Sequence, residues 1–127
     1  MDLKLLAFDA EDLCVMSAHL QDAALIASDM AWQPKERRFA LVCQRRDHVG
    51  GGADRACGLH FNFVTAAQRL RMPQGEAAPL KLIGLGFEAG ETPSGFVTLL
   101  FDGGAAVRLS VECIDASMRD LVPASQD

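Results

Sequence analysis

Two stretches of alternating apolar residues near the C-terminal end constrain the fold of this chain more than any other feature. The residues at every second position are Val97, Leu99 and Phe101 in the first stretch and Val107, Leu109, Val111 and Cys113 in the second. A period of two places such side chains on one face of a β-strand. A three-residue loop, Asp102-Gly103-Gly104, pairs Phe101 with Ala105, Leu99 with Val107 and Val97 with Leu109, and puts glycine where a left-handed conformation is required. The sequence therefore predicts an antiparallel hairpin in this register.

One helix is predicted near the N-terminus, over residues 10–23. Asp9 is a good N-cap residue, and the acidic residues at 11 and 12 suit the positive end of the helix dipole. Leu13, Met16 and Leu20 recur on one face and form an apolar stripe. Near the other end of the chain, Asp115 is predicted to cap a short closing helical turn that runs to Leu121.

The remaining periodic segments are predicted to be strands, at residues 3–8, 26–32, 38–45, 59–71 and 80–88. Pro34 suits the turn between the second and third of these. In the fourth, the apolar face changes near Phe63–Thr65, which indicates a bulge or a sharp bend and a strongly curved sheet. In the fifth, Gly84 and Gly86 share one face, which indicates that something packs close to the backbone. Residues 48–56 contain three consecutive glycines and are predicted to form a loop.

These elements predict an α+β fold in a single domain, 1–127. One N-terminal helix packs on a strongly bent, mostly antiparallel sheet of about six to seven strands, and a short helical turn closes the chain. A parallel sheet is disfavoured, because strands do not alternate with helices.

The composition favours a folded, cytoplasmic protein. Half of the residues are hydrophobic and 23% are charged, which is typical of a globular domain and not of a disordered chain. No apolar run approaches the roughly 20 residues of a membrane helix, and the N-terminus lacks the pattern of a secretory signal. The four cysteines are widely spread among apolar neighbours, which favours buried, reduced thiols in a reducing compartment.

Motifs that carry known chemistry are absent from the sequence. There is no CxxC, HxxxH or HxH pair, no GxSxG, and the glycine run lacks the Lys-Ser/Thr ending of a phosphate-binding loop. Ser17 and His19 lie close in sequence, but on a helix they point in different directions and cannot work together. We therefore predict no catalytic residues, no metal and no other cofactor, and a non-enzymatic protein is favoured over an enzyme.

Charge is segregated along the chain. Residues 31–72 hold eight basic and three acidic residues, whereas the two flanking segments together hold four basic and fourteen acidic ones. Arginine favours bidentate contact with carboxylate or phosphate. The candidate anion- or partner-binding residues are therefore Arg37, Arg38, Arg45, Arg46, Arg55, Arg69 and Arg71.

The charge pattern supports two interpretations. The basic and acidic segments can neutralise each other within the fold or between subunits, or the arginines can form a patch for an anionic partner. The first is favoured, and it indicates a non-enzymatic cytosolic interaction module that self-associates as a homodimer. In the second, the anionic partner can be an acidic protein. One alternative is a small-molecule-binding protein or enzyme with a pocket in the bent sheet. Another is an accessory nucleic-acid binder using residues 35–71, which a pI near 5.1, one Trp and no Tyr disfavour.

Several stretches resemble the pattern of a known family. They are Glu11-Asp12-Leu13, Ser17 through Ala23, Arg38-Phe39-Ala40-Leu41, Pro93-Ser94-Gly95, Phe101-Asp102-Gly103-Gly104 and Arg108 through Ile114. Together they resemble a small bacterial family catalogued as a domain of unknown function (family 2948). The resemblance covers nearly the whole chain and implies a cytosolic bacterial protein of one domain, with no assigned activity, cofactor or site. The chain departs from the family pattern after Leu121.

Overall fold

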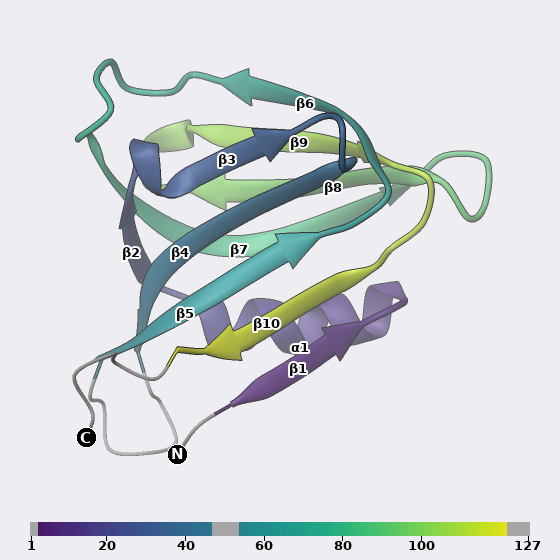
Figure 1. Ribbon diagram of the computed structural model, residues 1–127, viewed down its shortest axis with the longest axis horizontal. Coiled ribbons are helices and arrows are strands. Elements are labelled where there is room, and N and C mark those ends of the chain that lie inside the picture. Colours follow the sequence, from purple (N-terminus) through teal and green to yellow (C-terminus); the bar gives the residue numbers. More distant parts are fainter. Residues whose placement is uncertain (1–2, 47–53, 122–127) are drawn as a thin grey trace.

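The computed structural model describes residues 3–46 and 54–121 (Figure 1). The elements follow in the order β1 (Lys4–Ala7), α1 (Ala10–Leu20), β2 (Ala23–Ile26), the 3₁₀ turn η1 (Ala27–Asp29), β3 (Met30–Gln33), β4 (Arg38–Arg46), β5 (Asp54–Phe61), β6 (Val64–Leu70), β7 (Pro79–Ala89), β8 (Gly95–Phe101), the 3₁₀ turn η2 (Asp102–Gly104), β9 (Ala106–Val111) and β10 (Ala116–Asp120).

The strands form one large antiparallel sheet that bends strongly but does not close. Its order is β1-β10-β5-β4-β2-β7-β8-β9-β6, and β3 pairs with β4 beside this path. Figure 1 shows β1, β10, β5 and β4 side by side in front, with β7, β8 and β9 behind them. Helix α1 packs against β7 and β1, so it joins strands from the two layers. The expected α+β class is confirmed.

The helix begins as its sequence predicts and ends earlier. The Asp12 N–H donates to Asp9 Oδ1 (2.7 Å), which makes Asp9 the N-cap, and the three residues of the apolar stripe are buried. The helix ends at Leu20 because Asp22 takes a left-handed conformation (φ 68°) and Ala23 already begins β2.

The C-terminal hairpin confirms the predicted register. Leu99 lies opposite Val107, and the Phe101 N–H donates to the Ala105 carbonyl oxygen (2.9 Å). Gly103 (φ 85°) and Gly104 (φ 90°) both take the left-handed conformation that turns the chain.

The sharp bend at Phe63–Thr65 is also confirmed. Phe63 has φ 57°, and the pairing register shifts between Val64 and Ala66. Here the chain leaves β5, which lies between β10 and β4, and crosses to β6, which pairs only with β9. Phe63 is 46% exposed, whereas Phe61, two residues earlier, is buried.

The predicted number of strands was too low, and the closing helical turn was wrong. The segments 26–32 and 59–71 each divide into two strands, and the residues after Asp115 form β10, which raises the total to ten among the residues described. β10 is a strand because Ala116, Met118 and Asp120 are buried at every second position and because β1 and β5 pair on its two sides. Of the predicted loop 48–56, residues 54–56 belong to β5, and the three glycines lie outside the described residues.

The close approach expected at the glycines of β7 is confirmed at Gly84 and wrong at Gly86. A Cβ on Gly84 would lie 3.0 Å from the hydroxyl of Ser17 on α1, whereas a Cβ on Gly86 would meet nothing within 4 Å. The Leu85 N–H donates to the same Ser17 Oγ (2.9 Å). The group that packs on this backbone is therefore the helix.

No helix within residues 3–46 and 54–121 has the length and apolar character needed to cross a membrane.

Candidate functional site

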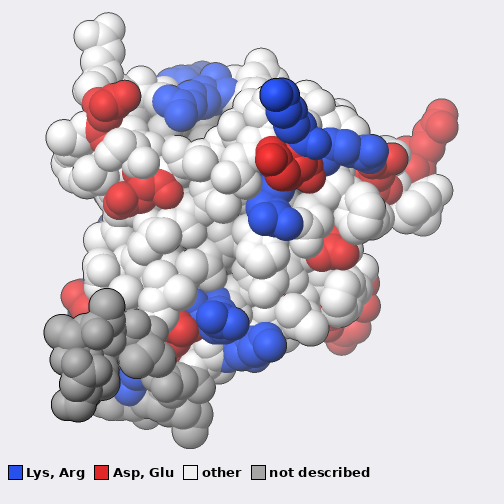
Figure 2. All heavy atoms as spheres, viewed as in Figure 1, with Lys and Arg blue, Asp and Glu red and all other residues white. Residues whose placement is uncertain are grey.

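The seven candidate arginines do not share one surface. Along β4 the side chains alternate, so Arg45 is buried (2% exposed) whereas Arg46 is exposed on the opposite face. Arg37 forms an ion pair with Glu112, and Arg38 Nε donates to Asn62 Oδ1 (3.2 Å). Figure 2 shows Lys and Arg in separate groups on this side of the molecule, with Asp and Glu among them. The nucleic-acid alternative depended on one continuous basic patch, so we do not pursue it.

Arg45 forms a buried ion pair that the sequence analysis missed. Its Nε and Nη2 donate to the two carboxylate oxygens of Asp120 (2.7 and 2.6 Å), and the Leu3 N–H donates to Asp120 Oδ2 (2.9 Å). Burial by itself would raise the pKa of Asp120, but the hydrogen bonds from Arg45 and Leu3 outweigh it and lower that pKa. The bidentate geometry and complete hydrogen bonding indicate a structural pair.

Arg69 lines a pocket between the free edges of β3 and β6. The pocket has a volume of about 340 Å³, and its lining residues are Ala27, Ser28, Met30, Arg69, Met72, Pro73, Gly75 and Glu76. They come from η1, the start of β3, the end of β6 and the segment that follows β6. The strong bend of the sheet brings these two stretches together, although about 40 residues separate them in the sequence.

Backbone hydrogen bonds fix the segments at the two ends of the pocket. At one end of the gap the Val64 N–H donates to the Arg37 carbonyl oxygen (2.9 Å). At the other end the N–H groups of Ala27 and Ser28 donate to the carbonyl oxygens of Ala78 (3.1 Å) and Glu76 (2.8 Å). The first bond links β6 to the turn before β4, and the other two continue the β2–β7 pairing into the segment that lines the pocket.

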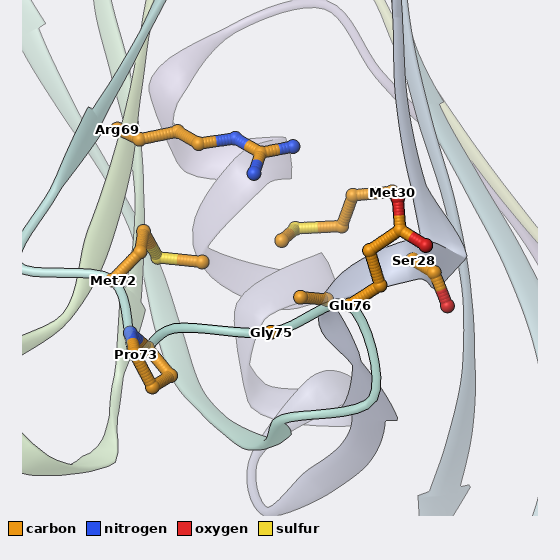
Figure 3. A pocket seen from close by; sticks show the side chains of 8 residues that line it. Ser28, Met30, Arg69, Met72, Pro73, Gly75 and Glu76 are labelled. Carbon is orange, nitrogen blue, oxygen red and sulfur yellow. The ribbon is translucent and has the colours of Figure 1, made fainter.

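The side chains of the pocket combine opposite charges with an apolar surface. In Figure 3, Arg69 reaches in from β6 on one side, with Met72 below it, and Glu76 lies on the other side, with the thioether of Met30 reaching in between. Met30 is buried, and Met72 packs partly against the core. Within the described part of the chain, neither Arg69 nor Glu76 forms a side-chain hydrogen bond or ion pair. The pocket therefore presents a cation and an anion that are not bonded to each other.

A second, shallower hollow lies on the outer face of β1, β10, β5 and β4. Its volume is about 640 Å³, and it lies over Gly58, where the absence of a side chain lowers the surface. Three apolar side chains at this hollow are exposed: Leu6 (53%), Val42 (43%) and Leu121 (40%).

The polar residues of this hollow include His60 on β5. Burial and, to a lesser extent, the nearby Arg38 lower the pKa of His60 below its ordinary value of 6.5. The imidazole is therefore neutral at pH 7. At one end of the face Arg38, Asn62 and Asp115 form a chain of hydrogen bonds, with the Asn62 amide donating to Asp115 Oδ1 (3.0 Å).

The four cysteines are free thiols, but they are not equally buried. Cys14 is exposed and Cys113 is half-buried, which corrects the expectation that all four are buried. Cys43 and Cys57 are buried and lie directly opposite each other on β4 and β5. No three His, Cys, Asp or Glu side chains in the described part of the chain lie close enough together to hold a metal ion.

The sequence contained a signal for Asp120 but none for the pocket. Ala116, Met118 and Asp120 stand at every second position, the strand period, and an acidic residue in such a core row needs a cationic partner. Met30 and Arg69, in contrast, carry no local pattern that relates one to the other.

Comparison with known proteins agrees with the resemblance seen in the sequence. Neither the curated proteins nor the solved structures gave a match. The family described as "Protein of unknown function (DUF2948)" matches residues 3–126, nearly the whole chain. Because the match covers nearly the whole chain, the chain belongs to that family.

Proposed function

We propose that this protein binds a small zwitterionic molecule in the pocket between β3 and β6. The observation that carries the proposal is the pair of unbonded, opposite charges, Arg69 and Glu76, on the two sides of an apolar surface. A carboxylate on the ligand would pair with the guanidinium, and an ammonium group would pair with the Glu76 carboxylate. The apolar body of the ligand would lie against Met30 and Met72, whose flexible thioethers adapt to irregular shapes.

The size and chemistry of the pocket support binding of a metabolite over catalysis. About 340 Å³ is near the lower end of the range for small-molecule pockets, which suits a ligand the size of an apolar amino acid. The described lining residues include no histidine or cysteine, so the pocket lacks a cysteine nucleophile and the imidazole base that usually activates a serine.

Calorimetric titration with L-leucine and L-methionine tests this proposal. Both are expected to bind, whereas leucinamide, which lacks the carboxylate, and 4-methylpentanoate, which lacks the ammonium group, are expected to bind much more weakly. Arg69→Gln removes charge-assisted hydrogen bonds of about 1.5–3 kcal/mol, so Kd is expected to rise about ten- to a hundredfold.

The matched control is Arg71→Gln, which makes the same change two residues away and outside the pocket. Its Kd is expected to equal that of the wild type. The proposal fails if no zwitterion produces heat or a rise in Tm, or if the two arginine variants weaken binding equally.

A second candidate function is self-association through the outer face of β1, β10, β5 and β4. It is supported by the exposed side chains of Leu6, Val42 and Leu121 around the hollow over Gly58. Lys4 and Arg119 are register partners at one end of this face, and Asp115 lies at the other. In a second copy that packs face to face and runs in the opposite direction, the basic end would meet Asp115.

Sedimentation velocity at micromolar concentration tests this candidate. We expect a dimer for the wild type and a monomer for Val42→Asp, which puts a charge beside Gly58 in the apolar part of the face. Leu100→Asp is the control, because Leu100 is equally exposed (46%) but lies on β8, away from this face. A wild type that stays monomeric would rule self-association out.

A further inference from the structure

The fold brings two buried thiols into contact. Cys43 on β4 and Cys57 on β5 are directly opposed in the antiparallel register, and their side chains are 2% and 0% exposed. The two thiols form a hydrogen bond with each other. Neither residue has a part in the pocket or in the outer face described above.

The backbone geometry at this pair suits a disulfide. Residues directly opposed in an antiparallel sheet have Cα atoms about 4.5 or 5.5 Å apart, depending on the type of pair. Disulfides form at Cα separations of roughly 4.4–6.8 Å, so both types fall within the range. Both side chains point to the same face of the sheet, and the bond can therefore form without moving the strands.

The surroundings of the two sulfur atoms are polar for a core. Asp120 is the register partner of Cys57, and Arg45 follows Cys43 on the same face of β4. The hydrogen bond from Cys43 and the positive charge of Arg45 lower the pKa of Cys57. Burial and the negative charge of Asp120 raise it, but the net effect is a lowered pKa. The same hydrogen bond and burial raise the pKa of Cys43. The two thiols therefore differ, with Cys57 the better nucleophile and Cys43 the one that keeps its proton.

We propose that Cys43 and Cys57 are a redox-sensitive pair that hydrogen peroxide converts to a reversible intramolecular disulfide. The Cys57 thiol releases its proton, and its thiolate sulfur attacks one peroxide oxygen. The O–O bond breaks, the attacked oxygen stays on the sulfur as a sulfenic acid, and the departing hydroxide takes up the released proton to give water. The Cys43 sulfur then attacks the Cys57 sulfur, the S–O bond of the sulfenic acid breaks as the S–S bond forms, and the departing hydroxide takes the Cys43 proton to give a second water. Two thiols are oxidised and one peroxide is reduced to two waters.

The burial of the pair selects the oxidant. Hydrogen peroxide is little larger than water and is polar, so small local openings of the fold that admit water also admit it to a site beside Arg45 and Asp120. Oxidised glutathione is far larger and would need direct access to a sulfur atom that is not exposed. The pair would remain reduced in a reducing compartment and respond to peroxide there, as redox-sensing cysteines do.

Peroxide treatment of the native protein, followed by intact-mass and peptide mass spectrometry, tests the proposal. A Cys14→Ser/Cys113→Ser background removes the two more accessible thiols. In this background we expect a loss of two hydrogen atoms, a peptide cross-linked through Cys43 and Cys57, full reversal by dithiothreitol, and no reaction with oxidised glutathione. The oxidised form is expected to have a higher Tm, because the cross-link closes the chain between the two cysteines.

Single variants in the same background assign the two roles. Cys57→Ser is expected to lose peroxide reactivity, whereas Cys43→Ser is expected to leave a sulfenic acid at Cys57 that dimedone captures when the peroxide is removed and the protein is unfolded in its presence. Circular dichroism checks that each variant is folded. If a serine variant does not fold, the alanine variant at the same position, Cys43→Ala or Cys57→Ala, takes its place. The proposal is overturned if both thiols react with peroxide only after denaturation. It is equally overturned if dimedone labels Cys43 in Cys57→Ser as fast as it labels Cys57 in Cys43→Ser.

Discussion

At the scale of single residues, Arg45 and Asp120 are the two charged side chains that the described part of the chain buries in its core. Both side chains are almost completely buried (3% and 2% exposed), and their charges compensate each other through two short hydrogen bonds. Burying two charges is costly, and the pair therefore contributes stability only while both partners are present. Removal of one partner leaves the other charge buried and unpaired.

We expect Arg45→Met to lower the free energy of unfolding by about 3–5 kcal/mol. The double variant Arg45→Met/Asp120→Leu is expected to recover most of this loss, because it leaves no unpaired charge in the core. Arg46→Met is the matched control, since the exposed neighbour should change stability by less than about 0.5 kcal/mol. Urea unfolding measures all three, and equal effects at 45 and 46 would contradict the role assigned to the pair.

The same pair predicts a dependence of stability on pH. Because the pKa of Asp120 in the folded state lies below its ordinary value of 3.8, the stabilisation is complete above that value and is lost as the pH falls through the folded pKa. The difference in unfolding free energy between the wild type and Asp120→Asn should therefore be constant at neutral pH and shrink as the pH falls below 3.8. A difference that stays constant on acidification would show that the carboxylate charge does not matter.

At the scale of elements, α1 depends on its first turn. Asp9 Oδ1 accepts the hydrogen bond from the Asp12 N–H, which would otherwise have no partner within the helix. We expect Asp9→Ala to destabilise the protein by about 1 kcal/mol, and Glu11→Ala, which removes an exposed first-turn charge but no cap, by about 0.3 kcal/mol. Thermal unfolding monitored by circular dichroism compares the two. Equal losses would mean that charge, and not the capping hydrogen bond, stabilises this end of the helix.

The bend between β5 and β6 is also a feature of single elements. The left-handed conformation of Phe63 and the register shift after Val64 redirect the chain from β5 to β6 within a few residues. The pocket exists because of this bend, since it places Arg69 across from Met30. A curved sheet with two free edges thus provides a binding site without any motif in the sequence.

At the scale of the whole molecule, the first and the last strand pair with each other in the sheet. β1 pairs with β10, so Lys4 lies opposite Arg119, and one cluster of buried side chains extends through the helix and the strands. Long-range pairing of this kind makes folding slow and cooperative. We expect a single unfolding transition in urea and refolding on the millisecond-to-second timescale.

Trp32 provides the test. It is the only tryptophan of the chain and lies on β3, beside the pocket and away from α1. Its fluorescence and the far-ultraviolet circular dichroism should follow the same unfolding curve. A fluorescence change at lower urea concentration would mean that β3 detaches before the rest of the sheet unfolds.

The sequence by itself determined the elements whose signals are local. The hairpin between Val97 and Val111, the start of α1 at Asp9 and the bend near Phe63 all follow from spacing, capping or alternation within about 15 residues. The same reasoning failed at β10, because Asp115 resembles a helix cap and only pairing with β1 and β5 makes the segment a strand.

Tertiary structure alone decided the sites. In the sequence Arg45 looks like the neighbouring exposed arginine, because its partner Asp120 lies 75 positions away. Cys43 and Cys57 belong to one pair only because β4 and β5 align in that register. The pocket of Arg69 and Glu76 exists only because the sheet curves without closing. The physical reason is the same in each case: local patterns depend on neighbours in the chain, whereas a site depends on contacts that form only when distant segments pack.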